Sequence, residues 1–235
     1  MFNTYDEFNK QDQVKDISLG NSARMYPTKL MRYWITSNLI PRVADLKVAE
    51  VGIGRGEMKY WMNSIVGFKY AVWDGYDVVK NAHIDGADYT NIYFGDATDA
   101  SWSLKSEYDC LILLHFLEHL HDPEAFALNS AKFVKSGGCI VGGMPSTPNF
   151  LIPAYERKMR SKSGDFGHVS AFSGKRLGKM ARLMGCSLEF LSGGYFARVD
   201  NSILEDQLWW LKLNAQFARH FHSVGTEIYF KFVKQ

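Results

Sequence analysis

Glycine and acidic residues gather in the stretch AEVGIGRGEM, residues 49–58. Gly52, Gly54 and Gly56 alternate with larger residues, and Glu50 precedes them. Glycine lets a backbone turn sharply and approach a ligand closely, and the amides at the start of a following helix favour a polar ligand. The spacing is E-x-G-x-G-x-G, whereas dinucleotide-binding loops prefer G-x-G-x-x-G. An acid at Glu50 suits a cationic ligand, such as one with an ammonium group, better than a pyrophosphate.

Further acids follow two later apolar runs. The stretch WDGYD places Asp74 and Asp77 at 18 and 21 residues after Gly56, and FGDATD contains Asp96. A carboxylate can accept hydrogen bonds from two vicinal hydroxyls, as in the dinucleotide-binding folds. Asp74 is favoured for this role because the apolar run 68–73 predicts a strand that ends beside it, and Asp77 stays open as the alternative.

Histidines provide the candidates for proton transfer near neutral pH. His168 lies in a predicted loop on the ligand-facing edge and is the leading candidate for a general base. His115 directly follows an apolar run and is the weaker candidate, since it either lines the site or closes the strand. The sequence shows no cluster with metal-ligand spacing, so no metal is expected.

Alternating strands and helices must position these residues. Apolar runs predict strands at 46–52, 68–73, 91–96, 108–114, 139–145, 187–192 and 227–233. Apolar spacing and cap residues predict helices from about Pro27 to 40 and at 57–65, 123–135, 173–185 and 203–221. This order predicts an α/β fold with βαβ units and helices on both faces of a mainly parallel sheet. Ligands of such sheets lie beyond the carboxyl ends of the strands, where the glycine loop is.

The order of these motifs resembles the class I S-adenosylmethionine-dependent methyltransferases. The segments YDCLILLHFLEHLHDPEAF (108–126), AKFVKSGGCIVGGMPS (131–146) and GHVSAFSGKRLGKMARLMGC (167–186) resemble the type 11/23-like subgroup that acts on small molecules. The resemblance covers about residues 46–192. It implies a Rossmann-like seven-stranded sheet whose last strand is antiparallel, S-adenosyl-L-methionine as cofactor and S-adenosyl-L-homocysteine as product.

The resemblance also implies a set of cofactor contacts. It places the glycine loop on the amino-acid and ribose parts of the cofactor, Asp74 or Asp77 on the ribose, and Asp96 on the adenine amino group. The complete expected set is Glu50, Gly52, Ile53, Gly54, Gly56, Asp74, Asp77, Asp96, Ala97, His115 and Phe116. Glu118 and His119 match the LEH motif of the subgroup, and His119 is expected to be structural.

We expect a single methyltransferase domain, residues 1–235. Within it, 1–45 forms a helical lid, 46–192 the cofactor-binding core, and 145–172 and 195–225 are inserts at the acceptor side or at a dimer contact. The candidates for acceptor contact are Arg24, Tyr26, Tyr155 and Arg157. The basic segment 149–165 suits an anionic acceptor such as a nucleotide-linked sugar, although a solvated helix face is the more ordinary explanation of its charge.

The expected activity is methylation of a small molecule, at oxygen of a sugar or related metabolite. HFLEH stands where amino methyltransferases of bases carry an Asn/Asp-Pro-Pro-aromatic motif, and a formal net charge of +2 gives no basic footprint, so nucleic acid is not an expected partner. The alternatives are a catalytically silent S-adenosylmethionine-binding partner protein and a nicotinamide-dependent oxidoreductase, which the glycine spacing disfavours. The expected location is cytoplasmic, without membrane association, because no run approaches the roughly 20 apolar residues of a membrane span and the first residues lack a signal-peptide core. A homodimer is left open.

Overall fold

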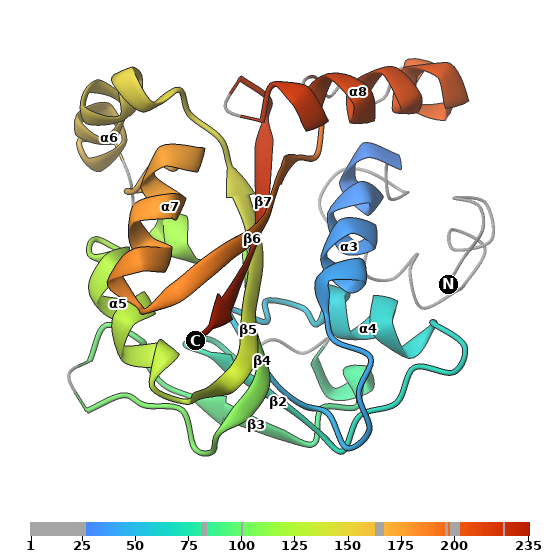
Figure 1. Cartoon of the computed structure of the whole chain (residues 1–235), viewed down its shortest axis with the longest axis vertical. Coiled ribbons are helices and arrows are strands. Elements are labelled where there is room, and N and C mark those ends of the chain that lie inside the picture. Colours follow the sequence, from blue (N-terminus) through green and yellow to red (C-terminus); the bar gives the residue numbers. More distant parts are fainter. Residues whose placement is uncertain are drawn as a thin grey trace.

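A seven-stranded sheet forms the centre of the molecule (Figure 1). The computed structural model describes residues 27–80, 84–99, 101–162, 167–195, 197, 203–222 and 224–235. The strands are β1 (Lys47–Val51), β2 (Val72–Asp77), β3 (Asn91–Phe94), β4 (Tyr108–Leu114), β5 (Val134–Pro145), β6 (Cys186–Gly193) and β7 (Glu227–Lys234), in the order β3-β2-β1-β4-β5-β7-β6. All neighbouring pairs are parallel except those of β7, which is antiparallel to both β5 and β6. The predicted Rossmann-like fold class, including the antiparallel last strand, is confirmed.

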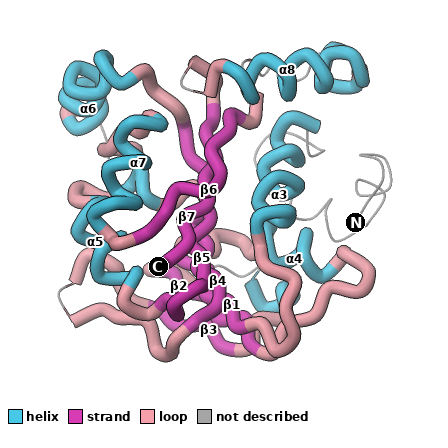
Figure 2. Tube along the Cα trace, in the orientation of Figure 1, coloured by secondary structure: helices cyan, strands magenta, loops and turns pink. Residues whose placement is uncertain are grey.

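Helices cover both faces of the sheet (Figures 1 and 2). On one face lie α3 (Pro27–Leu39) and α4 (Glu57–Asn63), and on the other α5 (Pro123–Ala131) and α7 (Gly174–Leu183). The helices α6 (Ile152–Arg160) and α8 (Leu208–His220) lie toward one end of the sheet. None of the helices in the described ranges has the length and apolar character that crossing a bilayer requires.

The central strand β4 shows how the sequence produces two cores. Leu111 and Leu113 point to the face covered by α5 and α7, whereas Cys110 and Ile112 point to the face covered by α3 and α4. All four side chains are at most 1% exposed. Parallel strands buried on both faces read as continuous apolar runs, which is why YDCLILL predicted this strand correctly.

The second strand differs from the prediction. Residues 68–73 were expected to form it, but β2 is Val72–Asp77. Phe68 and Tyr70 belong to a loop, and the rings of both side chains pack edge-on against Trp73. The Lys59 ammonium group lies over the Tyr70 ring. Their apolar character therefore reflects packing without strand pairing. The shift places Asp74 inside the strand and Asp77 at its end.

The boundary between α5 and β5 also differs. The helix was expected to reach residue 135, but it ends at Ala131, and β5 begins at Val134. Val134 pairs with Tyr108 before a register shift, so the first residues of β5 extend the sheet at its amino-terminal edge. Residues 203–221 contain a 3₁₀ helix, Ile203–Asp206, before α8 rather than one continuous helix.

Candidate functional site

The glycine loop lies at the point where the order of strands reverses. It follows β1, whose neighbours β2 and β4 lie on opposite sides. Gly52 and Gly56 have φ of +76° and +80°, a left-handed region that side chains with a Cβ rarely adopt. A Cβ on Gly52 would come within 2.7 Å of Phe116 Cδ2, and one on Gly56 within 2.8 Å of Ala87 Cβ. The loop is therefore a backbone cradle in which two glycines cannot be enlarged without displacing a neighbour.

Asp77 holds the glycine loop from the end of β2. The Gly54 amide donates to Asp77 Oδ2 at 2.8 Å, and the Val79 amide donates to Oδ1 at 3.0 Å. The side chain is half-buried, at the edge where the parallel strands end. This is the position that the sequence analysis assigned to Asp74.

Asp74 is buried away from the loop, and its expected position at a strand end is wrong. Its carboxylate accepts from Asn91 Nδ2 at 2.8 Å and from the Tyr108 hydroxyl at 2.7 Å. The Tyr76 and Tyr108 hydroxyls lie 2.7 Å apart, so the acid belongs to a polar cluster within the core. Asp74 is 3% exposed and supports β2 and β3.

Glu50 lies below the glycine loop on the α3 and α4 face. Trp73 Nε1 and the Tyr89 hydroxyl both donate to its Oε2, each at 3.0 Å. Burial raises the pKa of Glu50 to about 7, although these two hydrogen bonds and the nearby Lys59 ammonium group lower it. A carboxylate in this setting is poised to ionise when a cation approaches.

Asp96 and Ala97 occupy the loop after β3. The Asp96 side chain is exposed, and its Oδ1 accepts from the Thr98 amide at 2.8 Å and the Thr98 hydroxyl at 2.7 Å. These hydrogen bonds lower the pKa of Asp96, so the group is ionised at neutral pH. The loop is thereby fixed with an acceptor oxygen at the surface.

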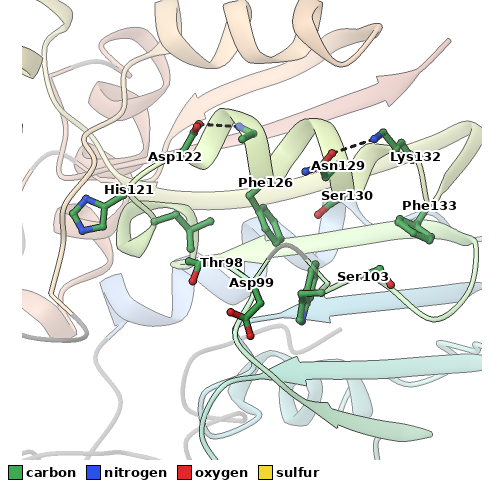
Figure 3. A pocket seen from close by; sticks show the side chains of 14 residues that line it. Thr98, Asp99, Ser103, His121, Asp122, Phe126, Asn129, Ser130, Lys132 and Phe133 are labelled. Carbon is green, nitrogen blue, oxygen red and sulfur yellow. Dashed lines mark hydrogen bonds between the residues drawn. The ribbon is translucent and has the colours of Figure 1, made fainter.

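A cavity of about 560 Å³ lies between this loop and α5 (Figure 3). Phe126 and Asn129 of α5 line one side, and Thr98, Asp99 and Ser103 line the other. Ala97 is the only member of the expected cofactor set among its lining residues. The cavity therefore adjoins the glycine-loop site without being that site.

His115 begins the segment after β4 and has φ of +52°, a left-handed conformation that is costly for a non-glycine residue. Its Nδ1 lies 3.1 Å from Glu118 Oε1, and its Nε2 lies 3.2 Å from Glu227 Oε1. Burial opposes protonation, but the Glu227 carboxylate and contacts with both acids raise the pKa of His115. The turn at His115 also directs Phe116 against Gly52.

His168 is brought against the 3₁₀ helix Leu117–His119. The Glu118 carbonyl accepts from the amides of Val169 at 2.8 Å and Ser170 at 3.0 Å, which fixes the loop that carries His168. The His119 and His168 rings meet edge to face with centroids 4.8 Å apart. Ligand atoms of Glu118, His119 and His168 all lie within 4.8 Å of one another. No metal-ligand cluster was expected from the sequence, because His168 lies far along the chain from Glu118 and His119.

The comparisons with known proteins decide the family. The model of a family described as a methyltransferase domain matches residues 24–189. This chain belongs to that methyltransferase family. It is a class I S-adenosylmethionine-dependent methyltransferase, and S-adenosylmethionine is its cofactor.

Solved structures share the fold of the methyltransferase. An S-adenosylmethionine-dependent methyltransferase from Mesorhizobium loti has a TM-score of 0.61 at 14% identity, over 87% of this chain and 98% of that chain. An O-methyltransferase family protein from Burkholderia thailandensis has a TM-score of 0.57 at 10% identity, over 88% of this chain and 57% of that chain. The [4+2]-cyclase SpnF has a TM-score of 0.55 at 13% identity, over 86% of this chain and 81% of that chain. No curated protein matches the sequence significantly.

The methyltransferase also contains a buried ionic network that the sequence analysis missed. Glu227, at the start of β7, accepts from Arg32 Nη2 at 2.5 Å and from the hydroxyls of Tyr195 and Tyr229. Burial alone would raise the pKa of Glu227, but the Arg32 guanidinium and His115 hold it well below its usual range. An acid at the start of the apolar run EIYFKFV was the available signal, because a buried acid must be paired. Arg32, His115 and Tyr195 are distant from Glu227 in sequence and could not be identified as its partners.

Replacing Glu227 with glutamine is expected to lower the free energy of unfolding of the methyltransferase by about 3 kcal/mol at pH 7, because the buried Arg32 loses its anion. A depressed carboxylate pKa stabilises the fold above the unfolded value of about 4.3 and loses that contribution as pH falls. The difference between wild type and variant should therefore stay constant between pH 7 and about pH 5 and shrink as pH falls below about 4.3 in urea titrations. The double variant Arg32→Met/Glu227→Gln should regain part of the loss, and equal additive losses would contradict the pairing.

Of the four candidates for acceptor contact in the methyltransferase, the structure describes two. Arg24 and Tyr26 lie outside the described residues. Tyr155 and Arg157 are exposed on α6, a helix without buried residues that follows the end of β5. Glu156 of the same helix anchors it, because it accepts from the Ala171 amide and from Arg176.

Proposed function

We propose that this methyltransferase transfers a methyl group from S-adenosylmethionine to a hydroxyl of a small molecule, a sugar or a related metabolite. A single observation carries the proposal. The glycine loop, Glu50, Asp77 and the segment that follows β4 from His115 onward meet at one edge of the sheet. The absence of an amide-holding motif after β4 favours oxygen over an exocyclic nitrogen as the acceptor atom. The domain organisation of the sequence analysis, with a lid before residue 46, remains part of this proposal.

The residues present fit the cofactor. The positive-φ glycines leave no room for a Cβ beside Phe116 and Ala87, as expected of a backbone that a ligand approaches closely. We assign Glu50 to the cofactor's ammonium group, Asp77 to the ribose hydroxyls and Asp96 to the adenine amino group. Gly52, Ile53, Gly54 and Gly56 would contact the amino-acid and ribose parts, and Ala97, His115 and Phe116 would line the adenine and sulfonium side.

When bound, the cofactor supplies a methyl group already activated on a sulfonium. The chain then has to align the acceptor, exclude water and accept a proton from the hydroxyl. We assign the last task to His168, and the exposure of its ring beside His119 of the segment that follows β4 supports this assignment. His115 is poorly placed for it, because both of its ring nitrogens face carboxylates.

The charge of the α6 segment supports an anionic acceptor. Arg157, Lys158 and Lys162 are exposed on or just after this helix, beyond the carboxyl end of β5. A nucleotide-linked sugar combines phosphates for such cations with hydroxyls for methylation. Tyr155, exposed on the same helix, is the accompanying candidate for contact with the sugar or base.

Calorimetric titration of the purified chain with S-adenosylmethionine and S-adenosylhomocysteine tests the cofactor site. Gly52→Ala is expected to weaken both ligands at least tenfold, because the new methyl group meets Phe116 in a strained backbone. Gly137→Ala is a matched control, since Gly137 has the same φ of +76° but no atom within 4 Å of an added Cβ. Equal affinities for the two variants, or binding of NAD instead, would overturn the assignment.

An acceptor screen tests the reaction. Formation of S-adenosylhomocysteine should depend on a hydroxylated acceptor, with nucleotide sugars ahead of the neutral sugars from which they derive. Turnover with amines alone would place the methyl group on nitrogen. Tight cofactor binding without turnover across oxygen, nitrogen and carbon acceptors would favour a silent cofactor-binding protein.

A further inference from the structure

We propose that Glu118, His119 and His168 bind a divalent transition-metal ion of the zinc class at the acceptor side of the site. The location relative to the acceptor rests on the proposed function, but binding of the ion does not. Two imidazoles and one carboxylate form a donor set that suits such ions and leaves coordination positions for water or substrate.

The first observation is the convergence of the three ligand groups. Their ligand atoms all lie within 4.8 Å of one another, although His168 is 49 residues from His119 in the sequence. Ligand atoms around a tetrahedral zinc ion are about 3.4 Å apart, as follows from metal–ligand distances near 2.1 Å. Closing the remaining gap requires a side-chain movement on the order of 1 Å, which exposed His168 can make.

The second observation is the Glu118 carboxylate itself. Glu118 is 1% exposed, and within the described part of the chain neither of its carboxylate oxygens has a hydrogen-bond partner of good geometry. Removing a carboxylate from water without replacing its hydrogen bonds is costly, so such a group calls for a cation. His115 Nδ1, 3.1 Å from Oε1, is placed behind Glu118 as an orienting partner, an arrangement common around metal ligands.

The surrounding structure holds the ligands in place. The backbone of Glu118 is tied to the loop after His168 by two hydrogen bonds, and the Ser170 hydroxyl donates to the Leu120 carbonyl at 2.7 Å. Arg160 Nε donates to the Val169 carbonyl at 3.0 Å, which links the same loop to α6. The loop after His168 therefore connects helix α6 with the proposed metal site.

An ion at this site would give His168 a different task from that of a general base. The ion accepts a lone pair of the acceptor hydroxyl and lowers the pKa of that hydroxyl, whose proton passes to water. The new oxygen–carbon bond then forms as the sulfur–carbon bond breaks, and the sulfonium becomes a neutral thioether. The charge balances without an oxidant or reductant.

The test is a titration of tag-free, chelator-treated protein with Zn²⁺ by calorimetry and with Co²⁺ by visible absorption. The wild-type chain should bind one ion, and His168→Ala and Glu118→Gln should each weaken binding at least thirtyfold. His220→Ala is the matched control, because this histidine is exposed at the end of α8, and it should bind the ion as the wild type does. Melting temperatures without metal establish that the variants are folded.

Absence of stoichiometric binding by the folded wild-type chain would overturn the metal site, as would unchanged affinity in His168→Ala. S-adenosylmethionine affinity, measured on the same samples, separates the two proposals. Retained cofactor binding and methyl transfer in metal-free protein would exclude a role of the ion in the reaction and leave the proposed function intact. If the wild-type chain binds Zn²⁺ but does not bind S-adenosylmethionine, the proposed function is wrong and the proposed metal site is retained.

Discussion

Replacing Glu50 with glutamine is expected to stabilise the cofactor-free protein at pH 8 while weakening S-adenosylmethionine at least tenfold. The burial that raises the pKa of Glu50 to about 7 makes its ionised form unfavourable in the folded state. Since each tenfold change in proton affinity corresponds to about 1.4 kcal/mol, a rise of the pKa from 4.5 to about 7 makes the cost above pH 7 on the order of 3–4 kcal/mol. Glutamine keeps an acceptor for Trp73 and Tyr89 and carries no charge.

The sign of the pH dependence follows from the raised pKa. Between about pH 4.5 and 7 the folded state retains a proton that the unfolded state has released, so wild-type stability falls as pH rises through this window. The variant lacks this slope, and the two proteins should have nearly equal stability at pH 5. Urea titrations at pH 5 and pH 8 measure the difference.

Cofactor binding should show the opposite dependence. The ammonium group of S-adenosylmethionine favours ionised Glu50, so wild-type affinity should rise with pH toward 8, and the variant should show a flatter profile. Methylthioadenosine, which lacks the amino-acid part, is the matched control ligand and should bind both proteins alike. Equal weakening of both ligands would show that Glu50 does not meet the ammonium group, and no gain in stability at pH 8 would contradict the raised pKa of Glu50.

The pair Asp77→Asn and Asp74→Asn should separate cofactor binding from stability. Asp77→Asn is expected to weaken S-adenosylmethionine at least thirtyfold, because two charge-assisted hydrogen bonds to the ribose become neutral ones. Asp74→Asn should leave cofactor affinity within about threefold and lower the free energy of unfolding by about 1–2 kcal/mol, because it disturbs the buried bonds to Asn91 and Tyr108.

Calorimetry and thermal unfolding of both variants provide the measurement. Asparagine at position 77 retains an oxygen for the Gly54 amide and loses only the exposed hydrogen bond from the Val79 amide, so the melting temperature of that variant should change little. The reverse outcome, with binding lost in Asp74→Asn and kept in Asp77→Asn, would show that Asp74 binds the ribose hydroxyls and Asp77 does not.

The sequence was sufficient for the elements whose apolar pattern follows from strand burial. YDCLILL predicted β4 and LKVAEVG predicted β1 because interior parallel strands are apolar on both faces. The pattern failed at β2, where the rings of Phe68 and Tyr70 pack against Trp73 and do not belong to a strand. Periodicity reports burial, and burial alone does not distinguish a packed loop from a strand.

The candidate site likewise has one part that could be predicted from the sequence and another part that could not. Its cofactor side is built from short segments that each follow a strand, so the glycine loop and the post-β4 segment could be predicted from local patterns. Its acceptor side depends on contacts between distant segments, such as Arg32 with Glu227 and His119 with His168. No local spacing contains these contacts, so the buried network and the ligand cluster became visible only in the folded chain.

The position of β7 couples the stability of one sheet edge to the order of the acceptor side. In the described sheet β6 pairs only with β7, and β7 also carries Glu227, the anion for Arg32 of α3. A fluctuation that withdraws β7 detaches β6 and strips α3 of its ionic anchor in the same event. Strands β1 to β3 do not pair with β7, whereas the segment after β4 contacts Glu227 of β7 through His115. We therefore expect β6, β7 and α3 to open together, as one cooperative unit, in local unfolding measured by hydrogen exchange.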